Sequence, residues 1–103
     1  MTLKEISDFL VGIDPDISHY ESMEKRDPYT FWEETRRLPF TADGAHEEGW
    51  RFYVHRYTQE EEDPIAAALM TALDTSDRIT VTHTVDYIPE RDLIHHIFEC
   101  EAY

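Results

Sequence analysis

The sequence predicts an α+β fold, with a mostly antiparallel sheet of about four or five strands and two helices packed on one of its faces. The first observation behind this prediction is the stretch Arg78–Ile88, in which apolar side chains alternate with threonines. Successive side chains of a strand point to opposite faces, so this strand has one apolar and one hydroxyl-lined face. The second observation is the order of the segments, helix, three strands, helix and two strands, which would bury every apolar stripe in one domain spanning residues 1–103.

The N-terminal segment begins with a capping box, Thr2-Leu-Lys-Glu5, and a helix is expected from there to about Val11. Gly12 stands where a C-cap is expected, and Asp14-Pro15 ends the helix because the residue before proline disfavours the α conformation. The apolar residues at helical spacing are Leu3, Ile6, Phe9, Leu10 and Ile13.

Three strands are expected next, at Ile17–Met23, Tyr29–Arg36 and Trp50–Thr58. The second could also be read as a helix, but its aromatic and β-branched start favours a strand. Leu38–Glu48 is expected to be a loop, since Asp43-Gly44 is a turn dipeptide. The strand Trp50–Thr58 carries an amphipathic face that comprises Arg51, Tyr53, His55 and Tyr57.

Asp63 as N-cap and Pro64 at the first helical position predict a helix over Asp63–Asp74. Its expected buried stripe comprises Ile65, Ala68, Leu69, Ala72 and Leu73. Pro89–Asp92 is the expected hairpin turn between the strand Arg78–Ile88 and a last strand, Asp92–Tyr103. In that last strand one face comprises Ile94, His96, Phe98, Cys100 and Ala102, and the other Leu93, His95, Ile97, Glu99 and Glu101.

The charge balance is strongly acidic, with 23 acidic and 9 basic residues and a formal net charge of −14. Such a chain repels nucleic acid and anionic membranes, and no stripe of Lys and Arg offsets this repulsion. Direct binding to nucleic acid is therefore not expected. The acidity fits simple solubility, a basic protein partner, or a wall past which DNA slides.

Targeting and compartment are read from the N-terminus and from cysteine usage. No signal peptide or membrane anchor is expected, because Met1–Glu5 lacks a basic region followed by an apolar block. The single cysteine, Cys100, cannot form an internal disulfide, which favours a reducing, cytoplasmic origin.

Histidines are the clearest candidates for chemistry. His83 and His96 are expected on the inward faces of consecutive strands, and His55 and His95 near each other on the opposite face. Two histidines and a carboxylate can bind zinc. No ligand spacing fixes such a site, however, so interior histidines with satisfied hydrogen bonds are the preferred interpretation, and no metal is expected.

Other candidates for chemistry have simpler explanations. Cys100 could act as a nucleophile beside a histidine, but a small buried residue explains it better. The acidic run Glu60–Asp63 could bind a cation, but a helix cap on a solvated turn is the better explanation. The three glycines are scattered and form no phosphate-binding loop. No cofactor is expected, and the chain is predicted not to be an enzyme.

Several segments together resemble the tail-terminator (tail-completion, minor tail) proteins of long-tailed bacteriophages and prophages. These segments are the N-terminal helix, Phe31-Trp32, Ala42-Asp43-Gly44, Tyr57-Thr58, Asp63-Pro64, Asp86–Glu90 and Leu93–Cys100. The resemblance covers about the whole chain in element order, and none of its motifs is catalytic.

This resemblance implies a non-enzymatic structural protein that assembles as a hexameric ring on the tail tube, ends tube growth and joins the head connector. The implied partners are the chain itself, the tail tube protein and the head–tail connector protein. The implied locations are the host cytoplasm during assembly and the virion tail. Tyrosine and arginine favour interfaces, so the candidate interface comprises Arg51, Tyr53, His55, Tyr57, Thr80, Thr82 and Thr84. An ordinary solvated sheet face explains the threonines equally well.

Two other classes of function remain open. An acidic binding protein, such as a DNA mimic that inhibits a nucleic-acid-binding enzyme, is favoured by the net charge alone. A small metal-dependent enzyme would have to use the histidines.

Overall fold

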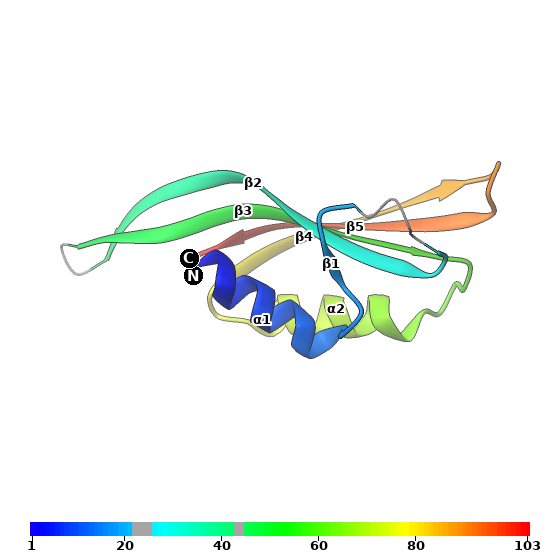
Figure 1. The fold of residues 1–103 in the computed structure, drawn as a ribbon, viewed down its shortest axis with the longest axis horizontal. Helices are drawn as coiled ribbons and strands as arrows, with labels where there is room; N and C mark the ends of the chain where they lie inside the picture. Colours follow the sequence, from blue (N-terminus) through cyan, green and yellow to red (C-terminus); the bar gives the residue numbers. More distant parts are fainter. Residues whose placement is uncertain (22–25, 43–44) are drawn as a thin grey trace.

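The computed structural model describes residues 1–21, 26–42 and 45–103, and the side chains of residues 40–42 and 45–47 are left aside. It contains two helices and one five-stranded sheet with strand order β1-β2-β3-β5-β4. Only β1 and β2 pair in parallel; the other neighbours are antiparallel. Both helices lie on the same face of the sheet (Figure 1). The predicted α+β architecture is confirmed.

Helix α1, Leu3–Ile13, begins with the predicted capping box: the Glu5 amide donates to Thr2 Oγ1 at 3.1 Å, and the Thr2 amide donates to Glu5 Oε1 at 3.0 Å. Ile6 and Leu10 are fully buried, which confirms the apolar stripe. The predicted C-cap at Gly12 is wrong. The helix continues through Gly12, and Asp14 caps it by donating its amide to Leu10 O, because Pro15 disfavours helical backbone only at Asp14.

Strand β1 is much shorter than predicted, Ser18–His19, and pairs with Phe31 and Trp32 of β2. It stops at Tyr20, whose positive φ of 70° lies outside the extended conformation of a strand. Ser22 and Met23, the end of the predicted strand, lie outside the described residues.

Strands β2, Tyr29–Ala42, and β3, Ala45–Thr58, form one long hairpin that extends beyond the helices (Figure 1). The predicted loop Leu38–Glu48 is therefore wrong. Pro39 pairs with Glu48 and Gly49 with Leu38 within the ladder, because an outer strand tolerates a proline that has no donor to offer on its open side. The predicted turn Asp43-Gly44 lies outside the described residues.

Helix α2, Pro64–Thr75, starts at the predicted N-cap Asp63. Leu69 and Leu73 are fully buried as predicted, but Ala66 takes the third buried position and Ala68 is exposed. The correction follows from helical geometry, since Ala66, Leu69 and Leu73 recur at spacings of three and four residues. Among the described residues, no helix is long and apolar enough to cross a membrane.

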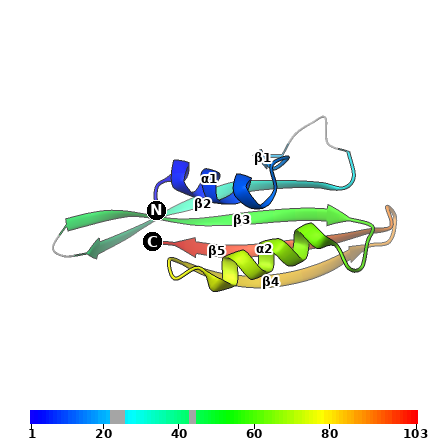
Figure 2. The same ribbon diagram turned by 90° about the horizontal axis from the view of Figure 1, so that it is seen from below.

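Strands β4, Ile79–Ile88, and β5, Leu93–Ala102, form the second hairpin, with the predicted turn between them. Figure 2 shows α1 over β2 and α2 over β5 and β4. The core lies between these two layers and contains Ile6, Leu10, Trp32, Phe52, Val54, Leu69, Leu73, Ile79, Phe98, Cys100 and Ala102.

Candidate functional site

The strand register brings the whole predicted interface onto one face of the sheet. On the ladder from β3 to β5, Arg51 pairs with Glu101, Tyr53 with Glu99, His55 with Ile97 and Tyr57 with His95. On the ladder from β5 to β4, Thr80 pairs with Glu101, Thr82 with Glu99 and Thr84 with Ile97. Directly paired side chains share a face. This face is opposite the one that packs on the helices, and we call it the helix-free face.

Aromatic rings cover one end of the helix-free face. Tyr57 stacks between Tyr29 and His95, with ring centroids 4.8 and 4.1 Å away. Phe31 stacks on His55 at 4.5 Å. Stacked rings shield one another from water, which explains why Phe31 is only 5% exposed without a helix above it.

Sequence reasoning missed Tyr29 and Phe31 as members of this face. The signal was present for Tyr29 and Phe31, since they alternate with Thr30 and Trp32, which are buried on the helix side. For His95 the sequence predicted the neighbour, His55, and the structure confirms it: His55 Nδ1 lies 2.9 Å from His95 Nε2.

Both histidines of the helix-free face are neutral at pH 7. Burial lowers the pKa of His95 to about 4, with a smaller contribution from the nearby His55. Burial also lowers the pKa of His55, although Glu33 Oε1, 3.4 Å from His55 Nε2, acts in the opposite direction. One neutral ring can therefore donate a hydrogen bond to the other.

The other end of the helix-free face is polar. Arg51 Nη2 donates to Glu101 Oε1 at 2.6 Å, and Tyr103 Oη donates to Glu101 Oε2 at 2.9 Å. These hydrogen bonds and the Arg51 charge lower the pKa of Glu101. The threonines Thr80, Thr82 and Thr84 lie beside this end and are exposed. The face as a whole thus joins an aromatic part to a hydroxyl- and charge-bearing part.

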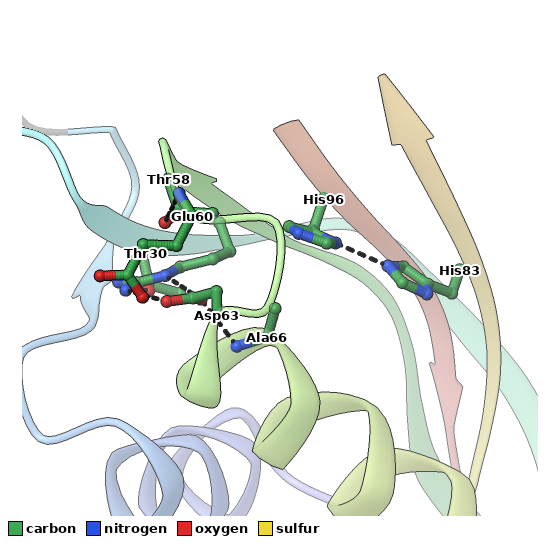
Figure 3. Close-up of polar contacts among 8 residues, drawn as sticks. Thr30, Thr58, Glu60, Asp63, Ala66, His83 and His96 are labelled. Atoms are coloured by element: carbon green, nitrogen blue, oxygen red, sulfur yellow. Dashed lines mark hydrogen bonds and ion pairs between the residues drawn. The ribbon is translucent and has the colours of Figure 1, made fainter. Parts of the chain in front are cut away.

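On the helix side, a buried polar group ties α2 to the sheet (Figure 3). Arg56 of β3 donates two hydrogen bonds to the Asp63 carboxylate, at 2.9 and 3.0 Å, and a third to Thr30 Oγ1 at 3.1 Å. Asp63 also caps α2 by accepting from the Ala66 amide at 2.9 Å. Burial by itself would raise the pKa of Asp63, but the hydrogen bonds from Arg56 and Ala66 bring it below its usual range.

The predicted approach of His83 to His96 is confirmed: His83 Nε2 is 3.0 Å from His96 Nδ1. This pair lies beside the Arg56–Asp63 group (Figure 3). Both histidines line a pocket of about 450 Å³ together with the start of α2. Burial lowers the pKa of both rings. Within residues 1–21, 26–42 and 45–103, no three His, Cys, Asp or Glu side chains are grouped so that they could hold a metal ion.

Cys100 is fully buried in the core. Burial raises the pKa of its thiol to about 12. The thiolate is the nucleophilic form, so this cysteine is a packing residue at neutral pH.

Comparison with known proteins supports the fold. No protein-family model matches the chain, and no curated protein matches it. Among solved structures, the chain is similar to a chain of the virion of a native gene transfer agent particle, with a TM-score of 0.53 and 9% sequence identity. The similarity covers 90% of this chain and 81% of the other. At this identity the likeness concerns the fold.

Proposed function

We propose that this chain is a non-enzymatic structural protein of a phage or prophage virion, and that residues 1–103 form one tail-terminator-like domain. Its role is to cap the tail tube as a hexameric ring and to join the tube to the head–tail connector protein. The observation that carries the proposal is the helix-free face, where aromatic rings, Arg51 and three threonines lie on one side of a sheet. The shared fold with a component of a gene transfer agent virion supports it.

The chemistry of this face suits docking. Tyrosine, other aromatic residues and arginine are enriched in protein interfaces because they offer large contact areas and hydrogen bonds together. The rings hold one another in place by stacking, so little side-chain entropy is lost when a partner covers them. The helix side, in contrast, is already used to build the core.

The acidic surplus is compatible with a ring through which DNA passes, since like charge prevents the DNA from sticking. The competing hypothesis of a DNA mimic stays a prediction. A DNA mimic needs carboxylates spaced along one surface, as the phosphates of DNA are. The exposed acidic residues of the described parts are instead spread over α1, the segments on either side of β1, both ends of α2 and the β4–β5 hairpin.

The test is electron microscopy of the protein mixed with tail tubes of the virus that encodes it. We expect ring-shaped density at tube ends, and tubes that no longer grow when tube protein is added. Tyr53→Ser, on the helix-free face, should abolish end binding. Val11→Ser is the matched control, since Val11 is 43% exposed on α1. A protein that stays monomeric and leaves tube growth unchanged would show the proposal to be wrong.

A further inference from the structure

Strand β4 is an outer strand with an open edge. The sheet order places it last, and among the described residues it pairs with β5 alone. Figure 2 shows it at the margin of the sheet. An open edge is a row of backbone donors and acceptors that can pair with another strand.

The hydrogen-bonding pattern identifies the residues whose backbone faces outward. The Tyr103 amide donates to Arg78 O at 2.9 Å, so Arg78 directs its backbone carbonyl toward β5. The direction alternates along an antiparallel strand. The N–H and C=O groups that face outward therefore belong to Ile79, Val81, His83, Val85 and Tyr87. The Tyr87 amide fits this assignment, since it donates to the carboxylate of its neighbour Asp86 at 3.1 Å.

Natural proteins protect open edges with lysine, proline, bulges or covering segments. The open part of β2, at the other margin of the sheet, has such devices: a bulge between Glu34 and Arg36, the charges of Arg36 and Arg37, and Pro39. Strand β4 has ten residues, no proline, no register shift toward β5 and one formal charge, Asp86. Two of its apolar side chains are largely exposed, Val85 at 56% and Tyr87 at 55%.

We propose that β4 pairs antiparallel with β4 of a second copy of this chain, so that two sheets join into one continuous sheet. A two-fold axis normal to the sheet preserves its faces, so residues that meet across the axis must point to the same side. The register that uses most of the strand puts His83 opposite His83 of the second copy. Val81 then lies opposite Val85, and Ile79 opposite Tyr87, with Thr82 opposite Thr84.

This register is favourable for the backbone hydrogen bonds, for the apolar side chains and for the charges. All five outward-facing residues fall in hydrogen-bonded pairs, which gives roughly ten backbone hydrogen bonds between the copies. In each copy, one of these bonds replaces the one from the Tyr87 amide to the Asp86 carboxylate. The exposed Val85 and Tyr87 gain apolar neighbours, and threonines meet threonines. Asp86 falls opposite Thr80, so no two like charges are directly opposed. Shifting the strands by one pair toward the turn would place Ile79 opposite Pro89, which has no donor. An isologous contact of this kind closes at two copies, so it concerns the protein free of tail tubes and is distinct from the contacts that a ring on a tube would use.

The test is the molar mass of the purified protein by sedimentation or light scattering. We expect a dimer for the natural chain and a monomer for Val85→Lys, since an edge lysine opposes strand pairing. Thr71→Lys, an exposed position on α2, carries the same charge change and should remain dimeric. Circular dichroism will show that the variants are folded.

Cross-linking tests the register. Thr82→Cys with Thr84→Cys should give a disulfide-linked dimer on a non-reducing gel, because the two cysteines of one copy lie directly opposite those of the other. The matched pair Thr80→Cys with Thr82→Cys should not cross-link.

A monomeric natural chain, or a dimer that Val85→Lys leaves intact, overturns the proposal. Cross-linking by the second cysteine pair and not the first overturns the register. These outcomes are independent of tube capping, which is read from tube ends.

Discussion

At the scale of single residues, the helix-free face contains two histidine rings that are neutral because they are partly buried among aromatic rings. His55 and His95 lie 2.9 Å apart and stack with Tyr57 and Phe31. A proton on either histidine would place a charge among these rings. Burial lowers the pKa of His95 to about 4, so the folded chain disfavours that charge.

This shift predicts a loss of stability in mild acid. Below pH 6.5 the unfolded chain binds a proton at His95, whereas the folded chain does so only near pH 4, so the free energy of unfolding falls as pH drops through this window. The lowered pKa values of His55, His83 and His96 act in the same direction.

Carboxylates with lowered pKa values, such as Asp63 and Glu101, lose their stabilising effect mainly below their ordinary pKa of 3.8 to 4.5. The stability lost between pH 7 and 5 is therefore expected to come from the histidines. With allowance for the partial exposure of His95, its share between pH 7 and 5 is about 1 kcal/mol. Urea unfolding at the two pH values measures it. His95→Gln should lose that part of the pH dependence, and equal stability of the natural chain at pH 7 and 5 would contradict this account.

At the scale of elements, the position of α2 depends on Asp63. This residue caps the helix and also pairs with Arg56, so one carboxylate fixes the helix start to β3. The sequence predicted the cap from Asp63-Pro64, which is local information. It did not predict the ion pair, because the pairing of Arg56 with Asp63 depends on how the turn between β3 and α2 brings the helix start back onto the sheet.

Removing this carboxylate should therefore cost more than a cap. Asp63→Ala leaves the buried Arg56 charge without its partner, and the expected loss is about 3–5 kcal/mol in the free energy of unfolding, compared with about 1 kcal/mol for a cap alone. The double variant Asp63→Ala with Arg56→Met should recover part of the loss, since it leaves no unpaired charge. Chemical denaturation measures all three proteins. If Asp63→Ala lowers the free energy of unfolding by only about 1 kcal/mol, as expected for loss of a cap alone, the ion pair is not important for stability.

The successes and failures of sequence reasoning at this scale have a common cause. Alternation over Ile79–Ile88 and capping signals at Thr2 and Asp63 are local, and all three predictions are confirmed. The loop predicted at Leu38–Glu48 was wrong because a turn dipeptide such as Asp43-Gly44 does not indicate how long the flanking strands are. Pro39 and Gly49 are tolerated within the long hairpin. Strand pairing depends on contacts between residues far apart in sequence, so the pattern of apolar residues along one segment does not predict it.

At the scale of the whole molecule, the core, the helix-free face and the open edge belong to different parts of the fold. The helices and one face of the sheet make the core, the other face presents rings and polar groups, and the margin at β4 offers an open backbone edge. The sequence predicted which residues share the helix-free face only as two separate sets, Arg51–Tyr57 and Thr80–Thr84. The two sets lie on the same face because β5 pairs with both β3 and β4 in the observed register, which the sequence did not predict.

The central proposal is that the helix-free face is a docking surface for components of a virion. Hydrogen–deuterium exchange of the protein, free and mixed with tail tubes of its own virus, tests this claim most directly. We predict slower exchange on tube binding in peptides that cover residues 51–57, with the exchange of α1 unchanged. Slower exchange confined to the helices, or no change anywhere when tubes are added, would contradict the account.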